Sequence, residues 1–138
     1  MATNEIYTEI ILELYKNPIN KGILPDANLV AGGGNPTCGD QATFYLKIDK
    51  NDLIKDIKFY GSGCAISIAS ESLLTEIVKG KSVAEVKKIT QKELFAQLGN
   101  IIQTRIKCAL LGLTILKKGI EEYEKSPKHK VNLHGIVV

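Results

Sequence analysis

Three cysteines and one aspartate are the residues of this 138-residue chain whose types and spacing point to chemistry. Cys38 and Asp40 share the turn GGGNPTCGDQA, Cys64 follows GSG, and Cys108 lies in RIKCALLG. A thiolate is a soft ligand and a carboxylate is a hard one. Three thiolates and one carboxylate make four ligands, which is enough for one tetrahedral zinc ion or for the protein's share of a small iron–sulfur cluster.

Each of these residues also has an ordinary structural role. A free cysteine is a good small core residue, and an aspartate after a glycine commonly caps its own turn. The spacing alone leaves Asp40 balanced between a cap and a ligand, because Cys-x-Asp with two distant cysteines is not a CxxC zinc signature. For the cysteines together, the settings of all three favour the ligand role.

Those settings are a glycine-rich turn, a helix start and a helix margin. The glycines around Cys38 allow it to project into solvent or into a cleft. Cys64 opens a predicted helix, where free backbone N–H groups and the helix dipole favour a thiolate. Cys108 falls about 120° from the centre of the apolar stripe of its helix, and Gly112, one turn later, leaves room beside it. We therefore expect Cys108 to be reachable.

The elements that must position these residues follow from hydrophobic periodicity. Residues 4 to 16 predict an amphipathic helix with Asn4 as its cap. Residues 42–49 and 54–61 predict an antiparallel hairpin, and residues 28–33 predict a weaker third strand. A helix follows from Cys64 to Gly80, with one apolar face: Ile66, Ala69, Leu73 and Ile77.

Two short helices with Ser82 and Thr90 as caps come next, and then a long helix from about residue 101 to 124. The tail from 124 to 138 is polar and then apolar, which leaves three alternatives: a flexible tail, a late strand or a contact with a partner. The order of elements predicts a two-layer α+β fold.

Composition limits the class of protein. A length of 138 residues predicts one domain, 1–138, and 44% hydrophobic with 24% charged residues is typical of a soluble globular chain. The sequence contains no apolar run long enough for a membrane span and no basic leader, so we expect a cytoplasmic protein with reduced thiols and no membrane contact. The net charge of +3 is spread along the chain without interleaved aromatics, so we expect no nucleic-acid partner.

Four segments around these residues resemble the IscU/SufU/NifU-N-terminal family of iron–sulfur cluster scaffold proteins. They are YKNPINKG, NPTCGD, GSGCAISIASESLLTE and RIKCALLG, in the order and approximate spacing of that family, and the resemblance covers roughly residues 5 to 122. It implies a three-stranded antiparallel sheet packed against helices, with a site built from Cys38, Asp40, Cys64 and Cys108.

The resemblance also implies a function. Members of this family accept persulfide sulfur from a cysteine desulfurase, combine it with iron into a [2Fe–2S] cluster and release the cluster to apo-proteins. They are assembly platforms and not conventional turnover enzymes. A hard oxygen ligand binds iron sulfide less strongly than a thiolate does, so Asp40 would keep such a cluster labile.

The chain differs from both main subtypes. IscU-type members carry a histidine before the third cysteine and an upstream Leu-Pro-Pro-Val-Lys motif read by a dedicated Hsp70 chaperone. Here the region reads NIIQTRIKC, with Lys107 in place of the histidine, so neither a histidine ligand nor that chaperone is implied. RIKC is similar to SufU-type members, which bind zinc through the equivalent residues and act as sulfurtransferases. In that role Cys108 would be the better candidate to accept the persulfide. Those members carry an insertion between the second and third cysteines, whereas only 43 residues separate Cys64 from Cys108 here. Both roles therefore stay open.

Four further residues have weaker functional interpretations. Arg105 could stabilise a thiolate or contact the desulfurase, and Lys107 could pair with Asp40 in the metal-free form. His129 and His134 lie in the tail, where the more ordinary interpretation is that they do not take part in the site. In a homodimer, a flexible tail could nevertheless supply a ligand to a neighbouring subunit.

Overall fold

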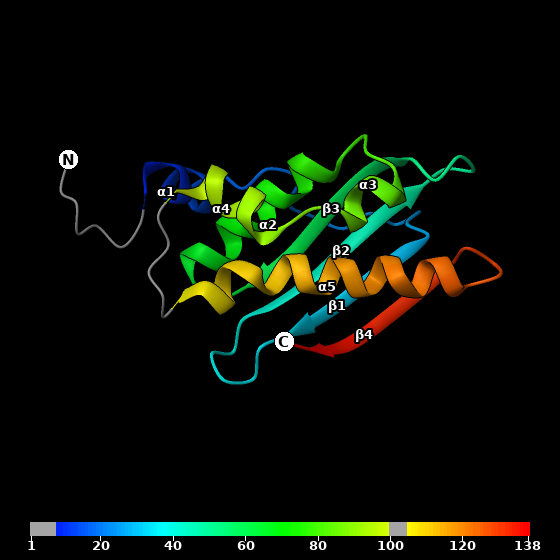
Figure 1. Cartoon of the computed structure of the whole chain (residues 1–138). Coiled ribbons are helices and arrows are strands. Elements are labelled where there is room, and N and C mark those ends of the chain that lie inside the picture. The colour runs from blue at the N-terminus through cyan, green and yellow to red at the C-terminus, as the bar shows by residue number, and fades with distance from the viewer. Residues whose placement is uncertain (1–7, 100–104) are drawn as a thin grey trace.

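The fold has two layers, a four-stranded sheet and a set of helices that cover one of its faces (Figure 1). The computed structural model describes residues 8–99 and 105–138. The elements in chain order are α1 (Glu9–Lys16), β1 (Leu29–Gly34), β2 (Gln41–Ile48), β3 (Ile54–Ser62), α2 (Ala65–Val78), α3 (Val83–Lys87), α4 (Gln91–Leu98), α5 (Ile106–Lys125) and β4 (Val131–Val137). The predicted α+β class is confirmed.

The sheet differs from the prediction in its number of strands. Its order is β3-β2-β1-β4, in which β1, β2 and β3 pair antiparallel and β4 lies parallel to β1. The expectation of three antiparallel strands is therefore wrong, and of the alternatives for the tail the structure has the late strand. The sequence signal was weak because Gly135 interrupts the apolar alternation and because the partner strand lies about a hundred residues earlier.

One glycine of β1 explains how β4 lies so close. A Cβ added at Gly33 would come within 2.2 Å of the Ile136 carbonyl oxygen, so a larger residue there would push β4 away. The ladder is irregular at this point, with a register shift between Ala31 and Gly33. The glycine run before the Cys38 turn thus has a packing role within the sheet.

The predicted hairpin is confirmed, and its alternation shows which face is buried. Along β2 the side chains directed at the helices are buried and the intervening ones are half-buried. The buried side chains of β2 are Ala42, Phe44, Leu46 and Ile48. Helix α5 covers β1 and β2 on this face, as Figure 1 shows, so the last helix encloses the core on the side opposite the sheet.

Helix α2 is more deeply buried than its predicted apolar face required. Leu73 and Ile77 are only half-buried, whereas three serines, Thr75 and Glu71 are buried. The reason is that α2 contacts α1 on one side and α5, α4 and β3 on others, so little of its surface is left for solvent. A single apolar stripe was the wrong expectation for a central helix.

The helix ends follow the predicted capping in part. Ser82 and Thr90 cap α3 and α4, as expected. Helix α1 begins at Glu9, and its cap is Thr8; the predicted cap, Asn4, lies outside the described residues. The first residues of the predicted last helix, 101–104, also lie outside them, and α5 begins at Ile106. Within residues 8–99 and 105–138, the structure contains no helix with the length and apolar character needed to cross a bilayer.

Candidate metal centre

The turn that carries Cys38 is built from local hydrogen bonds. Asn35 N–H donates to the Asp40 carbonyl at 2.9 Å, Gly39 N–H donates to the Asn35 carbonyl at 2.8 Å, and Thr37 N–H donates to Asn35 Oδ1 at 2.9 Å. Gly39 has φ +78°, a conformation that favours glycine. The turn therefore presents Cys38 at its exposed tip, as predicted.

The carboxylate of Asp40 is directed away from its own turn. Asp40 is buried, and its Oδ1 accepts a hydrogen bond from Cys64 N–H at 3.2 Å while its Oδ2 lies 3.6 Å from Cys64 Sγ. A Cβ added at Gly63 would come within 2.4 Å of Oδ1, and Gly63 has φ +148°. Only glycine fits there, so the GSG segment is what allows Asp40 to reach the start of α2.

Cys64 is the N-cap of α2. Its Sγ accepts a hydrogen bond from Ser67 N–H at 3.4 Å, so the sulfur contacts a free N–H group of the first helical turn. This confirms the predicted place of Cys64 at a helix start. A metal ion or a sulfur donor approaching Cys64 also approaches Asp40, because the two side chains are in contact.

Cys108, on the first turn of α5, is only 5% exposed, and the prediction that it is reachable is wrong. The room expected beside Gly112 is filled, since a Cβ there would lie 3.1 Å from both Phe44 and Glu71 side-chain atoms. Burial, and then the neighbouring Cys64 and Asp40, raise the pKa of the Cys108 thiol to about 12. Cys108 is therefore a protonated thiol at neutral pH in the metal-free protein.

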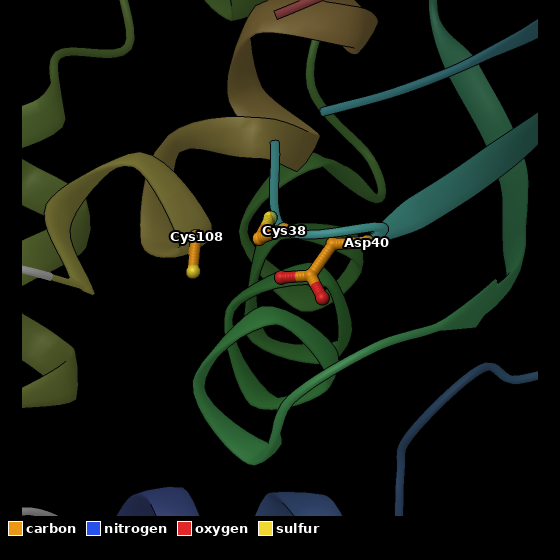
Figure 2. Close-up of side chains that lie close together, drawn as sticks. All are labelled: Cys38, Asp40 and Cys108. Atoms are coloured by element: carbon orange, nitrogen blue, oxygen red, sulfur yellow. The ribbon is translucent and has the colours of Figure 1, made fainter. Parts of the chain in front are cut away.

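Cys38, Asp40 and Cys108 converge at one end of the sheet. One ligand atom from each lies within 4.8 Å of the others (Figure 2). Figure 2 shows the first two side chains on the turn before β2 and the third on α5. Cys64 joins this group through its contact with Asp40. The structure thus brings together all four residues singled out from the sequence.

Three sulfurs and one oxygen form a donor set that suits zinc or iron, and a cysteine binds such a metal as a thiolate, after its thiol has lost its proton. Cys108 would therefore have to release its proton when a metal binds. Solvent reaches the site at the exposed Cys38, whereas Asp40 and Cys108 are buried on its inner side.

The other residues weighed in the sequence lie outside this group. Lys107 is exposed and forms no ion pair with Asp40 within the described part of the chain. Arg105 is the half-buried N-cap residue of α5. The ring of His129 lies 5.4 Å from that of Tyr123, and His134 is exposed on β4.

Glu71 is a feature that the sequence interpretation missed. This side chain is fully buried in α2; its Oε2 accepts a hydrogen bond from Ser67 Oγ at 2.7 Å, and its Oε1 has no partner among the described residues. Burial raises its pKa to about 8, and the charge of Asp40 adds to this, while the Ser67 hydrogen bond opposes it. Its signal was a carboxylate in the apolar segment AISIASESLL.

The fold and the site together define a small two-layer α+β domain that gathers candidate metal ligands at one end of its sheet. The family model of the NifU-like N-terminal domain matches residues 6–130, and the chain belongs to this family. The matched region contains the whole candidate site and ends before β4.

Named relatives fall into both subtypes. The chain is 42% identical over 118 residues to the iron–sulfur cluster assembly scaffold protein IscU of Aquifex aeolicus, covering 85% of this chain and 75% of the relative. It is 36% identical to the zinc-dependent sulfurtransferase SufU of Bacillus subtilis, covering 86% and 92%. It is also similar to the crystal structure of a protein proposed as the SUF-system scaffold of Fervidobacterium islandicum, with a TM-score of 0.70, 29% identity and coverage of 86% and 99%.

Proposed function

We propose that this protein is a scaffold on which a labile [2Fe–2S] cluster is assembled from iron and persulfide sulfur and then passed to apo-proteins. Cys38, Asp40, Cys64 and Cys108 are the proposed ligands. The partners are a cysteine desulfurase, which supplies the sulfur, and the acceptor apo-proteins. The cluster is cargo, so the site must both bind it and release it.

The observation that carries the proposal is the convergence of these residues. Ligand atoms of Cys38, Asp40 and Cys108 lie within 4.8 Å of one another, and Cys64 contacts Asp40. Cys38 lies on an exposed turn, so one ligand can swing away without opening the core. Asp40 supplies the oxygen that a purely thiolate site lacks, which favours release.

The test is reconstitution followed by transfer. The protein is incubated anaerobically with a cysteine desulfurase, cysteine and ferrous iron, and cluster formation is followed by charge-transfer absorption and Mössbauer spectroscopy. The product is then mixed with an apo-ferredoxin. We expect a brown protein that transfers its cluster, loss of the cluster in Cys38→Ser, Cys64→Ser and Cys108→Ser, and retention in the exposed control Lys107→Ala.

A second function is a zinc-dependent sulfurtransferase of the SufU type, with the same four residues on zinc and Cys108 as persulfide acceptor. Two observations favour it. The relative of that name matches most of both chains, and the convergence of Cys38, Asp40 and Cys108, with Cys64 in contact with Asp40, offers the four ligands that a tetrahedral zinc ion takes. Persulfide transfer to Cys108 would require the thiol to be uncovered and deprotonated, because it is buried in this structure.

The two functions predict different proteins. A colourless protein with one tightly held zinc, which stimulates a desulfurase and transfers no cluster to apo-ferredoxin, would replace the first proposal with the second. The persulfide position can be read by mass spectrometry after incubation with desulfurase and cysteine. Persulfide on Cys38 and not on Cys108 would contradict the role given to Cys108.

A further inference from the structure

The two edge strands of the sheet, β3 and β4, differ in whether their outward backbone groups are hydrogen-bonded. The β3 edge is closed by backbone hydrogen bonds from two irregular segments. Gly22 N–H donates to the Phe59 carbonyl at 2.8 Å, and Phe59 N–H donates to the Asn20 carbonyl at 3.0 Å. Further along, Gly80 N–H donates to the Ile54 carbonyl, at 2.9 Å. A partner strand therefore has no free row of groups to pair with on this edge.

The β4 edge is open. In residues 8–99 and 105–138, no segment pairs with the side of β4 that faces away from β1. Val131 N–H donates to the Asn28 carbonyl at 2.9 Å, so in a parallel ladder the backbone groups of the next residue, Asn132, point outward. Val138 N–H donates to the Gly34 carbonyl in the same way, which leaves the groups of Val137 outward.

Natural proteins usually protect such an edge with charged side chains or proline. The β4 sequence, VNLHGIV, has neither a lysine, an acid nor a proline. Val137 is 66% exposed, the most exposed large hydrophobic residue in the described part of the chain. The bulge opposite Ala31 and Gly33 leaves regular stretches on either side of it, Val131–Leu133 and Ile136–Val137.

The surface beside this edge carries both signs of charge. A groove of about 470 Å³ lies between α5 and β4, and Lys118, Glu121 and Glu122 line its helical side. Lys125 lies 3.4 Å from Glu121 and 3.9 Å from Glu122, whereas Lys118 has no ion-pair partner among the described residues. A two-fold axis brings the same patch of two copies together, so a patch with a lysine and adjacent acids is complementary to itself.

We propose that the β4 edge is a dimerisation surface for a second copy of this chain. The β4 strands of two copies pair antiparallel about a two-fold axis, which joins two four-stranded sheets into one of eight strands. The first regular stretch of each β4 then lies against the second stretch of the other, and Lys118 faces the acidic side chains of the partner's α5. β4 lies beyond the region that the family model matches, so the family match does not include this surface.

The test measures the oligomeric state of the full chain by sedimentation velocity over a range of concentrations. We expect a monomer–dimer equilibrium. Val137→Lys places a charge on the exposed edge, and Asn132→Pro removes an outward N–H without removing a bond to β1. Each should raise the dimer dissociation constant at least tenfold. The matched control is Ile23→Lys, which replaces a similarly exposed apolar residue, 60% exposed, away from β4.

Charge reversal tests the two-fold arrangement separately. Lys118→Glu should weaken the dimer, and the double variant Lys118→Glu, Glu122→Lys should restore it, since the exchanged charges face each other again. Circular dichroism and thermal melts show whether each variant is folded. If either Val137→Lys or Asn132→Pro is unfolded, the dissociation constant of the other one tests the role of the β4 edge. A wild-type protein that stays monomeric would overturn the proposal, as would a dimer that both edge variants leave unchanged.

Discussion

Glu71→Gln is expected to stabilise the protein and to remove a specific pH dependence. The substitution keeps the size and shape of a fully buried side chain and can still hydrogen-bond to Ser67. What it removes is a carboxyl group whose pKa rises from 4.5 to about 8 on folding, mainly because burial disfavours the charged form.

The magnitude follows from that shift. Below pH 4.5, Glu71 is protonated in both the folded and unfolded states, so its ionisation does not affect stability. Between pH 4.5 and about 8, the unfolded chain releases the proton and the folded chain keeps it, so stability falls as pH rises. One pH unit corresponds to about 1.4 kcal/mol, so the loss is about 3 kcal/mol at pH 7. Above the folded pKa the loss stops growing.

The assay is denaturant unfolding of the metal-free, reduced protein from pH 5 to 9, for the wild type and Glu71→Gln. The difference between their unfolding free energies cancels the other titrating groups. It should rise with pH by about 1.4 kcal/mol per unit and level off near pH 8. Glu76→Gln, which makes the same substitution at an exposed glutamate of the same helix, is the matched control. A flat difference for Glu71→Gln would refute the reasoning.

Three further predictions concern the proposed site. Asp40→Ala should lengthen the lifetime of a reconstituted cluster and slow its transfer to apo-ferredoxin, since the oxygen ligand favours release; both are followed by absorption. Gly63→Ala should weaken zinc or cluster binding and destabilise the fold, because its Cβ would meet the Asp40 carboxylate at 2.4 Å in addition to the backbone strain at φ +148°, which costs on the order of 1–3 kcal/mol. Gly80→Ala, with positive φ but open space around it, should show the strain alone. In the metal-free protein, iodoacetamide should label Cys38 first and Cys108 last, because Cys38 is exposed while Cys108 is buried with its pKa raised to about 12; peptide mass spectrometry reads the order.

Each of these has a clear contrary result. Unchanged lifetime and transfer in Asp40→Ala would remove the role of Asp40 in lability. Equal stability losses in the two glycine variants would mean that the Asp40 contact at Gly63 costs nothing. Labelling of Cys108 as fast as Cys38 in the folded protein, with both equal in denaturant, would mean that the buried place of Cys108 is transient.

Local patterns in the sequence determined much of this protein. Alternating apolar residues in 42–49 and 54–61 specified the hairpin, because side chains on a strand point to opposite faces. Ser82 and Thr90 specified two helix starts, because their hydroxyl groups accept bonds from N–H groups within three residues. The order of the cysteine motifs also identified the family.

The tertiary structure alone decided what depends on residues far apart in the chain. Periodicity placed Cys108 at a helix margin, but packing of α5 against α2 and the sheet buried it. Turn chemistry left Asp40 between a cap and a ligand, and only the approach of Gly63 and Cys64, some 24 positions later, directed its carboxylate across to α2. The same holds for β4, whose strand depends on β1, and for Glu71, whose burial depends on the elements around α2. A sequence shows short-range preferences directly, whereas burial and electrostatic coupling arise only when the distant segments meet.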